Sequence, residues 1–249
     1  MTSPPDFVVL HTNDLHGKLT KAAATRIAME RSSTPNSILL DCGDAVSSGN
    51  IYYRPGGEPI LARMSDLGYD AMSMGNREFH FLKAGLHSKA SLARFPILSA
   101  NLHGRPSDGN LPSLPSVNLT VNEIRIAIFG LTVPMITREM FVSKFSPYRF
   151  DDPIATASKI VPDLRRECDF LIALTHIGLQ KDMELAESVR GIDLVVGGHT
   201  HMVLSEPKFV GTTAIVQAGS WGRFLGRTEI ARSSNGGWEI SERLIDLSI

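Results

Sequence analysis

Carboxylate, amide and imidazole side chains gather in five short motifs, each of which follows a run of apolar residues. In chain order, these motifs supply a set of oxygen and nitrogen donors: Asp14, His16, Asp44, Asn76, His176, His199 and His201. Such donors without thiolates are typical of Mn, Fe, Co or Zn sites that remain open for chemistry. The composition of the five motifs therefore predicts a centre for divalent metal ions.

Each motif taken alone also has an ordinary structural explanation. Asp44 beside Gly43 is compatible with a turn residue, and His176 with a histidine that only hydrogen-bonds to its surroundings. His199-Thr200-His201 is only suggestive as a metal motif. The five motifs together, in this order and each at the end of an apolar run, favour a metal centre.

The elements that must position these side chains alternate between strand and helix. Short apolar, β-branched runs predict strands at residues 7–10, 37–41, 70–74, 96–100, 124–131, 170–175, 194–197 and 214–217. Helical patterns cover residues 18–31, 58–67, 78–94, 153–167 and 181–190. Alternation of this kind indicates an α/β fold, in which sites form at the carboxyl ends of the strands.

Two further segments depart from this alternation. Residues 225–247 are expected to form strands only, with a turn at Asn235-Gly236-Gly237. Residues 103–115 are rich in Gly, Pro, Ser and Asn and are expected to form a surface loop within one domain.

The composition excludes several classes of protein. The 249 residues are 43% hydrophobic and 20% charged with a net charge of −1, which excludes a disordered chain. Near-neutral charge argues against a nucleic-acid polymer or an acidic membrane as the main partner. No apolar run reaches the roughly 18 residues that span a bilayer, and the first ten residues do not resemble a secretory signal. With only two cysteines, Cys42 and Cys168, we expect a cytoplasmic protein.

Longer strings around the motifs resemble one known family. They are HTNDLHG, DCGD, GNREF, SANL, LTHIGLQKD, GIDLVVGGHTH and QAGSWGRFLG. These strings resemble the catalytic domain of the 5′-nucleotidase / 2′,3′-cyclic phosphodiesterase family, within the calcineurin-like metallophosphatase superfamily. The resemblance runs from about residue 7 to residue 229 and implies a four-layer α/β/β/α sandwich.

The resemblance also implies a ligand set and a reaction. One ion would be held by Asp14, His16, Asp44 and His201, and a second by Asp44, Asn76, His176 and His199, with Asp44 bridging. A hydroxide bridging the two ions would attack the phosphorus of a small phosphate ester, and nucleotides and cyclic nucleotides are candidate substrates. No side-chain nucleophile is needed, which agrees with the absence of a G-x-S-x-G motif.

One departure from the family lies beside the expected ligand Asn76. The family usually reads Gly-Asn-His-Glu, whereas this chain has Arg77 at the His position and His80 where the family has an Asp. Asn76, Arg77 and His80 are therefore the candidate catalytic residues. Arg77 can brace phosphate oxygens but cannot release a proton near neutral pH. His80 or water would have to protonate the leaving group, and the alternative is a catalytically weakened protein that binds metal and phosphate.

A second departure concerns substrate choice. Many members of the family carry a C-terminal domain that stacks the nucleoside base, and we expect residues 1–249 to form a single catalytic domain without it. Trp221, Tyr52 or Tyr53 would then offer a flat face to a ligand, although packing is the simpler role for each. Another copy of the chain or a separate partner that covers the site is the remaining alternative.

Overall fold

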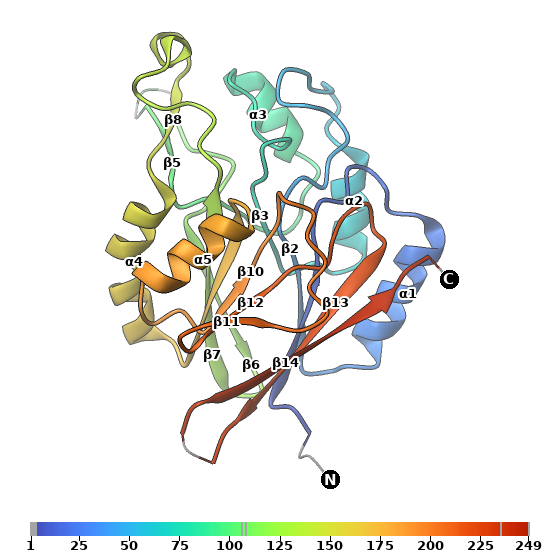
Figure 1. Ribbon diagram of the computed structural model, residues 1–249. Helices are drawn as coiled ribbons and strands as arrows, with labels where there is room; N and C mark the ends of the chain where they lie inside the picture. The colour runs from blue at the N-terminus through green and yellow to red at the C-terminus, as the bar shows by residue number, and fades with distance from the viewer. Residues whose placement is uncertain (1–3, 106, 108, 235, 249) are drawn as a thin grey trace.

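Two six-stranded sheets form the centre of the computed structural model, which describes residues 4–105, 107, 109–234 and 236–248 (Figure 1). The first sheet has the strand order β14 (Trp238–Asp246), β13 (Phe224–Arg232), β1 (Phe7–Thr12), β2 (Ser37–Asp41), β3 (Ala71–Ser73), β4 (Ile97–Leu98). The second has the order β11 (Lys208–Val210), β12 (Thr213–Val216), β10 (Leu194–Val196), β9 (Phe170–His176), β7 (Ile124–Thr132), β6 (Ser116–Val121).

Helices cover the outer face of each sheet (Figure 1). The first sheet packs against α1 (Lys21–Ser32), α2 (Pro59–Asp66) and α3 (Lys83–Ala90). The second packs against α4 (Pro153–Glu167) and α5 (Leu179–Ser188). No helix in the described ranges has the length and apolar character needed to cross a membrane.

The alternation of side chains along the strands creates the layers. In β1, Val8 and Leu10 pack into the core beneath the first helices, whereas Phe7 and Val9 pack between the two sheets. In β7, the even-numbered Ile126 and Ile128 share that central core, and Phe129 faces α4 and α5. Because successive strand residues point to opposite faces, each sheet is apolar on both sides. The expected four-layer α/β/β/α sandwich is confirmed.

Parallel pairing brings the motif-bearing strand ends to one rim. β1, β2 and β3 are parallel neighbours in the first sheet, and β7, β9 and β10 are parallel neighbours in the second. Within each sheet, these strands therefore end at the same edge. The loops after β1, β2 and β3 face the loops after β9 and β10 across the top of the sandwich.

The helix expected over residues 78–94 is much shorter in the structure. Only Lys83–Ala90 is helical, as α3, because residues 78–82 are occupied in other contacts. The Glu78 carboxylate accepts three backbone N–H groups, and His80 Nδ1 accepts the Leu82 N–H. Side chains that bond backbone groups in this way compete with helix formation.

Other expected boundaries are closer to the observed ones. α4 spans residues 153–167 as expected, with the Asp152 side chain accepting the Ala155 N–H at its start. The all-strand segment forms the antiparallel pair β13 and β14, in which Arg232 lies opposite Trp238. Of its expected turn, Asn235 lies outside the described residues. Within the expected loop 103–115, β5 (Leu102–Gly104) pairs with β8 (Tyr148–Phe150), a contact that the sequence did not predict.

Candidate metal centre

The loops at the rim hold several of the expected ligands in an unusual backbone conformation. Positive φ angles of 47–76° occur at five of them: Asp14, His16, Asp44, His199 and His201. Residues other than glycine rarely adopt this region, and they tend to cluster at functional sites. Backbone hydrogen bonds between the loops hold this conformation in place. The Asp14 N–H donates to the Gly43 carbonyl, and the His16 N–H donates to the Asp44 carbonyl.

A first group of donor atoms surrounds one oxygen of Asp14. Asp14 Oδ1 is buried and accepts no hydrogen bond within the described part of the chain. His201 Nε2 lies 3.4 Å from it and His16 Nε2 lies 3.9 Å from it. The two Nε2 atoms are 3.0 Å apart. A buried acceptor facing two imidazole nitrogens has the composition of a cation site.

A second group lies on the other side of Asp14. Its ligand atoms come from Asp14, Asp44 and His176, all within 4.8 Å of one another. His176 Nε2 lies 3.4 Å from Asp44 Oδ1 and 3.2 Å from Asn76 Oδ1. His176 Nδ1 donates to the Cys42 carbonyl at 2.7 Å, which leaves the Nε2 lone pair for the group.

His199 completes the set of expected ligands. Its backbone N–H donates to Asp14 Oδ2 at 2.9 Å, and its ring centroid lies 5.0 Å from that of His176. All seven expected ligands thus lie along one rim, four from the first sheet and three from the second. The structure makes Asp14 common to both groups, whereas the family resemblance placed Asp44 in the shared position.

The electrostatics of this rim suit a divalent cation. Burial raises the pKa of Asp14 to about 7 and raises the pKa of Asp44 as well. Burial also lowers the pKa of His176 to about 3 and that of His16 to about 4. Buried carboxylates are costly without a positive partner, and neutral imidazoles offer lone pairs. The residues present therefore fit a site for metal ions.

Arg77 lies at the edge of this cluster. Its backbone N–H donates to Asp44 Oδ1 at 2.7 Å, and its Nε lies 3.5 Å from Asp44 Oδ2. Its Nη1 donates to the Ser47 carbonyl at 3.0 Å, while 35% of the side chain remains exposed. The guanidinium thus faces the cluster and keeps donors free for a further anion.

His80 lies apart from the cluster. Its buried ring stacks on Phe81 at 4.9 Å and meets Tyr53 edge-on at 5.0 Å. Its Nδ1 accepts the Leu82 N–H, and a Cβ on Gly85 would stand 2.3 Å from the ring. None of these contacts joins His80 to Arg77 or to the expected ligands, so its catalytic role remains a prediction without geometric support.

Other candidates from the sequence have structural partners. The Asn101 amide donates to the carbonyls of Thr132 and Asp151 and accepts the Thr132 N–H, so it braces β7 and not a ligand. Trp221 is 62% exposed, and its ring centroid lies 5.9 Å from that of His201. It therefore stands beside the cluster, whereas Tyr53 packs on His80.

Three supporting residues were not assigned a role from the sequence. The Glu78 carboxylate accepts the N–H groups of Asp44, Val46 and Gly75 at 2.8–3.0 Å. Asn13 joins the first motif to the residues after β12 through Gly219 and Ala218. The fully buried Lys89 donates to Ser48 and to the Gly49 and Arg77 carbonyls. In the sequence, Glu78 and Asn13 are marked only by their place next to expected ligands, and nothing marks Lys89 as a supporting residue.

Comparison with known proteins agrees with this arrangement. Residues 7–203 match the family described as calcineurin-like phosphoesterase. The trifunctional nucleotide phosphoesterase protein YfkN of Bacillus subtilis is 35% identical over 93% of this chain and 18% of its own length. The 5′-nucleotidase of Bos taurus is 29% identical over 94% of this chain and 48% of its own length. This chain thus spans less than half of either relative.

A solved structure extends the likeness to three dimensions. The 5′-nucleotidase precursor from Thermus thermophilus superposes with a TM-score of 0.80 at 25% identity, over 96% of this chain and 54% of the other. The matched range, residues 7–203, contains β1 to β10, the rim loops and all seven expected ligands. The chain belongs to the calcineurin-like phosphoesterase family.

Proposed function

We propose that this protein is a metal-dependent hydrolase of small phosphate esters. The observation that carries the proposal is the pair of donor groups sharing Asp14, with the Arg77 guanidinium beside them. Nucleotides are the first substrate class to test, because relatives carry the names nucleotide phosphoesterase and 5′-nucleotidase.

The proposed ligands are distributed over two ions. Divalent ions in such a centre activate water for in-line attack and neutralise charge on the phosphoryl group. One ion would be held by Asp14, His16 and His201. The other would be held by Asp44, Asn76, His176 and His199, together with the Asp14 carboxylate, which belongs to both groups. The hydrogen bond from His176 to the Cys42 carbonyl fixes the ring for this purpose.

Arg77 would bind the phosphate oxygens. Its guanidinium is held by Ser47 and Asp44, so little conformational freedom is lost when an anion binds. Because it cannot release a proton near neutral pH and His80 is packed away, the proposal leaves protonation of the leaving group to solvent. Esters with good leaving groups should therefore react fastest.

Turnover of model esters tests this function. We expect the chain to hydrolyse p-nitrophenyl phosphate with Mn²⁺ and to lose that activity with a chelator. Bis-p-nitrophenyl phosphate, assayed in parallel, separates monoesterase from diesterase activity. A panel of nucleotides and cyclic nucleotides then addresses the natural substrate class.

The alternative function is binding of metal and phosphate without useful turnover. The Arg77 guanidinium beside Asp44 is the observation that favours it, because an arginine can hold phosphate oxygens but cannot protonate the leaving group near neutral pH. Stoichiometric Mn²⁺ binding without hydrolysis of either p-nitrophenyl ester would establish this alternative. Activity that appears only with a second protein would instead show that a partner completes the site.

A further inference from the structure

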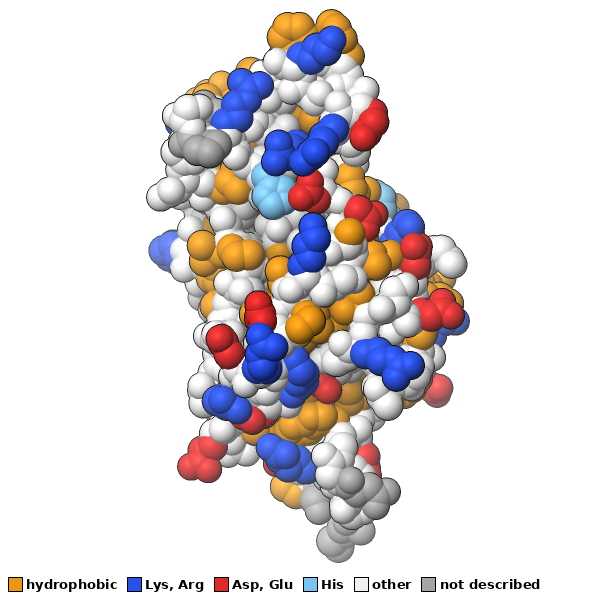
Figure 2. Space-filling view, turned by 90° about the vertical axis from the view of Figure 1, so that its left-hand side faces the viewer, with side chains coloured by type: hydrophobic (Ala, Val, Ile, Leu, Met, Phe, Trp, Pro, Cys, Tyr) orange, Lys and Arg blue, Asp and Glu red, His pale blue; other side chains and the backbone are white. Residues whose placement is uncertain are grey.

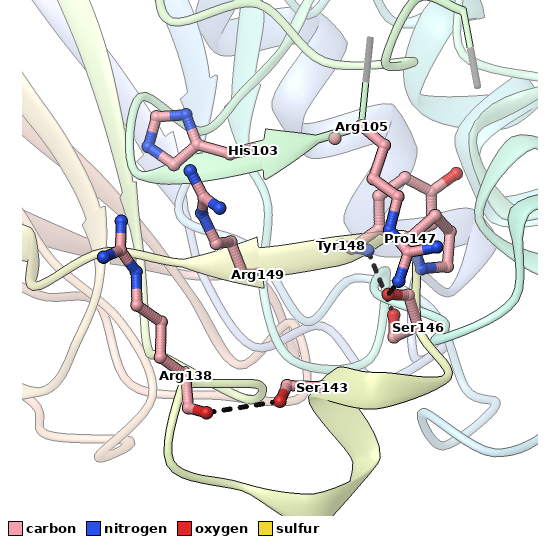
Figure 3. A pocket seen from close by; sticks show the side chains of 9 residues that line it. His103, Arg105, Arg138, Ser143, Ser146, Pro147, Tyr148 and Arg149 are labelled. Carbon is pink, nitrogen blue, oxygen red and sulfur yellow. Dashed lines mark hydrogen bonds between the residues drawn. The ribbon is translucent and has the colours of Figure 1, made fainter. Parts of the chain in front are cut away.

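A second cavity lined by arginines lies at the top of the molecule, outside the metal cluster. It has a volume of about 330 Å³ and is lined in part by His103, Arg105, Arg138, Ser143, Ser146 and Arg149 (Figure 3). Its walls come from β5, β8 and the segment between β7 and β8 that includes the 3₁₀ helix η2 (Phe141–Lys144). The volume falls within the range of small-molecule sites.

Three arginines give this cavity its positive charge, while two carboxylates lie near its edge: Asp151 beside His103, and Glu139, which interacts electrostatically with Arg138. Figure 3 shows the side chains of Arg138 and Arg149 extending side by side toward the level of His103. His103 has a carboxylate partner, Asp151, at 3.0 Å, whereas in the described ranges none of the cavity's three arginines forms an ion pair. Figure 2 shows Lys and Arg side chains around a histidine high on this face, together with acidic side chains, one of which lies directly beside the histidine.

All three arginines are exposed, so water and salt screen part of their mutual repulsion. A phosphate bound beside them would remove what remains, and the neighbouring guanidiniums of Arg138 and Arg149 offer bidentate donors to phosphate oxygens. The protein as a whole has a net charge of −1, so this local excess is not a consequence of a basic chain. The hydroxyls of Ser143 and Ser146 add polar groups to the wall.

The cavity is built on a firm base. Arg105 N–H donates to the Pro147 carbonyl at 3.1 Å, and its guanidinium donates to the Ser146 carbonyl at 3.3 Å. Ser146 Oγ donates in turn to the Phe81 carbonyl at 3.1 Å, and Phe79 packs against Tyr148. The wall formed by Arg105 and Ser146 is therefore held in place before any ligand arrives, which reduces the entropy lost on binding.

The same contacts link the cavity to the metal cluster. Phe79 and Phe81 belong to the segment that follows Asn76 and Arg77. The chain that forms the lower wall leaves β7 at Thr132, which lies opposite His176 of β9. Both sites thus occupy the same end of the sandwich.

We propose that this arginine cavity binds a phosphate group other than the one cleaved at the metal cluster. That group comes from a remote part of the substrate or from free inorganic phosphate, and both present the same tetrahedral oxyanion. The inference that the phosphate belongs to the substrate rests on the proposed function, whereas the inference that the cavity binds phosphate does not.

Calorimetric titration of inorganic phosphate tests whether the cavity binds phosphate. The full chain is titrated with Mn²⁺ present and after chelation, as wild type, as Arg138→Gln/Arg149→Gln and as Arg138→Lys/Arg149→Lys. We expect one phosphate-binding event to survive chelation, to weaken at least tenfold in the Gln variant and to be intermediate in the Lys variant. The control Arg63→Gln/Arg190→Gln removes two exposed arginines elsewhere and should bind as wild type.

Steady-state kinetics of the Mn²⁺-loaded protein then distinguish the two sources. Alkanediol bisphosphates of increasing length are compared with the matching monophosphates. A KM at least fivefold lower for a bisphosphate in wild type, lost in the Gln variant, identifies a remote substrate phosphate. Equal KM values with intact phosphate binding identify free phosphate.

Two results would overturn the proposal. One is the absence of phosphate binding after chelation, and the other is equal binding in the Gln variant and in the Arg63→Gln/Arg190→Gln control. Circular dichroism of each variant shows whether it is folded before its result is counted. Failure of every protein to hydrolyse p-nitrophenyl phosphate would contradict the proposed function and leave the titration result standing.

Discussion

Asp44 contacts both Arg77 and His176, which belong to two other motifs at the rim. Its Oδ1 accepts the Arg77 N–H and lies 3.4 Å from His176 Nε2, while Oδ2 faces the guanidinium. Its own N–H is held by Glu78. An Asp in this position binds a cation through charge as well as through geometry, which an amide cannot match.

We therefore expect Asp44→Asn to lower kcat/KM for p-nitrophenyl phosphate by at least about 100-fold, which corresponds to roughly 2.7 kcal/mol of transition-state stabilisation. Metal content after gel filtration should fall at the same time. The control is Asp163→Asn, which removes an exposed carboxylate on α4. Near-normal turnover with two retained ions would contradict a role for Asp44 as a metal ligand.

Arg77→His tests the origin of leaving-group preference. An arginine binds phosphate in the ground state and in the transition state alike, which does not by itself raise kcat. A histidine can also donate a proton to the departing oxygen. We expect the variant to gain turnover on alkyl esters relative to aryl esters, so that its rate depends less steeply on leaving-group pKa.

The measurement is kcat/KM across a series of phosphate monoesters, with Arg166→His on α4 as the control. Equal slopes for wild type and variant would contradict this role of Arg77. Adding His80→Asp is not a useful refinement, because the His80 ring fills a space bounded by Phe81, Tyr53 and Gly85. Its loss would leave a cavity in the packing.

At the level of single residues, the sequence predicted which polar side chains meet at the rim but not the packing around them. Asp14, His176 and His201 could be placed because polar residues after parallel strands must meet at one edge. The surroundings of His80 could not, since they combine the rings of Tyr53 and Phe81 with the backbone at Gly85. Lys89 has the sequence position of an exposed helix lysine, and it is buried by contacts with Ser48, Gly49 and Arg77.

At the level of elements, prediction failed where side chains replaced the regular backbone bonds. The helix expected from residue 78 begins at Lys83, because Glu78 bonds the loops after β2 and β3 instead. The strand β8 was missed because its partner β5 lies more than 40 residues earlier. By contrast, α4 begins where Asp152 and Pro153 indicate, since capping is a local property.

A buried acid connects three elements behind the His199 loop. Asp182 of α5 accepts the hydroxyl of Thr175 in β9 at 2.6 Å and the amide of Gln217, after β12, at 3.1 Å. Gln217 also accepts from Thr200. Burial raises the pKa of Asp182 to about 7, so its protonated form is favoured in the folded chain.

The pH dependence of stability follows from this shift. A carboxyl with a raised folded-state pKa binds its proton more tightly when folded, so stability falls as pH rises from about 4 to 7. Asp182→Asn cannot ionise. The free energy of unfolding of wild type relative to this variant should therefore fall with rising pH by up to about 1.4 kcal/mol per unit.

Urea unfolding at pH 4.5, 5.5 and 6.5 measures this difference, and titration of the metal ligands cancels because both proteins contain them. Asp163→Asn, which changes an exposed carboxylate, should show no such trend. A difference between wild type and Asp182→Asn that stays constant over this range would mean that Asp182 remains ionised in the folded protein.

At the scale of the whole molecule, the cluster is one place where the two sheets meet in polar contacts, and the contacts of Thr132 with Met74 and Ser99 are another. Asp14, Asp44 and Asn76 follow strands of the first sheet, and His176 and His199 follow strands of the second. The hydrogen bonds from His199 to Asp14 and from His176 to Cys42 cross between the sheets. Alternation in the sequence predicted an α/β fold and the family resemblance implied two sheets, whereas their facing geometry comes from the shared core of Phe7, Phe170 and their neighbours.

Metal binding should therefore stabilise both sheets and not only the rim loops. A ligand present at 100 times its Kd stabilises a fold by about 2.7 kcal/mol, which corresponds to a rise in Tm of roughly 5–10 °C for a chain of this size. The two tryptophans report separately, since Trp221 stands beside His201 and Trp238 packs on Phe7 and Phe170 between the sheets. Thermal unfolding followed by fluorescence in Trp221→Phe and Trp238→Phe, with Mn²⁺ or with chelator, should give equal shifts from both probes. His201→Ala should reduce the shift in each. A shift seen only by Trp221 would confine the effect of metal to the loops, and no shift from either probe would contradict a metal centre that joins the two sheets.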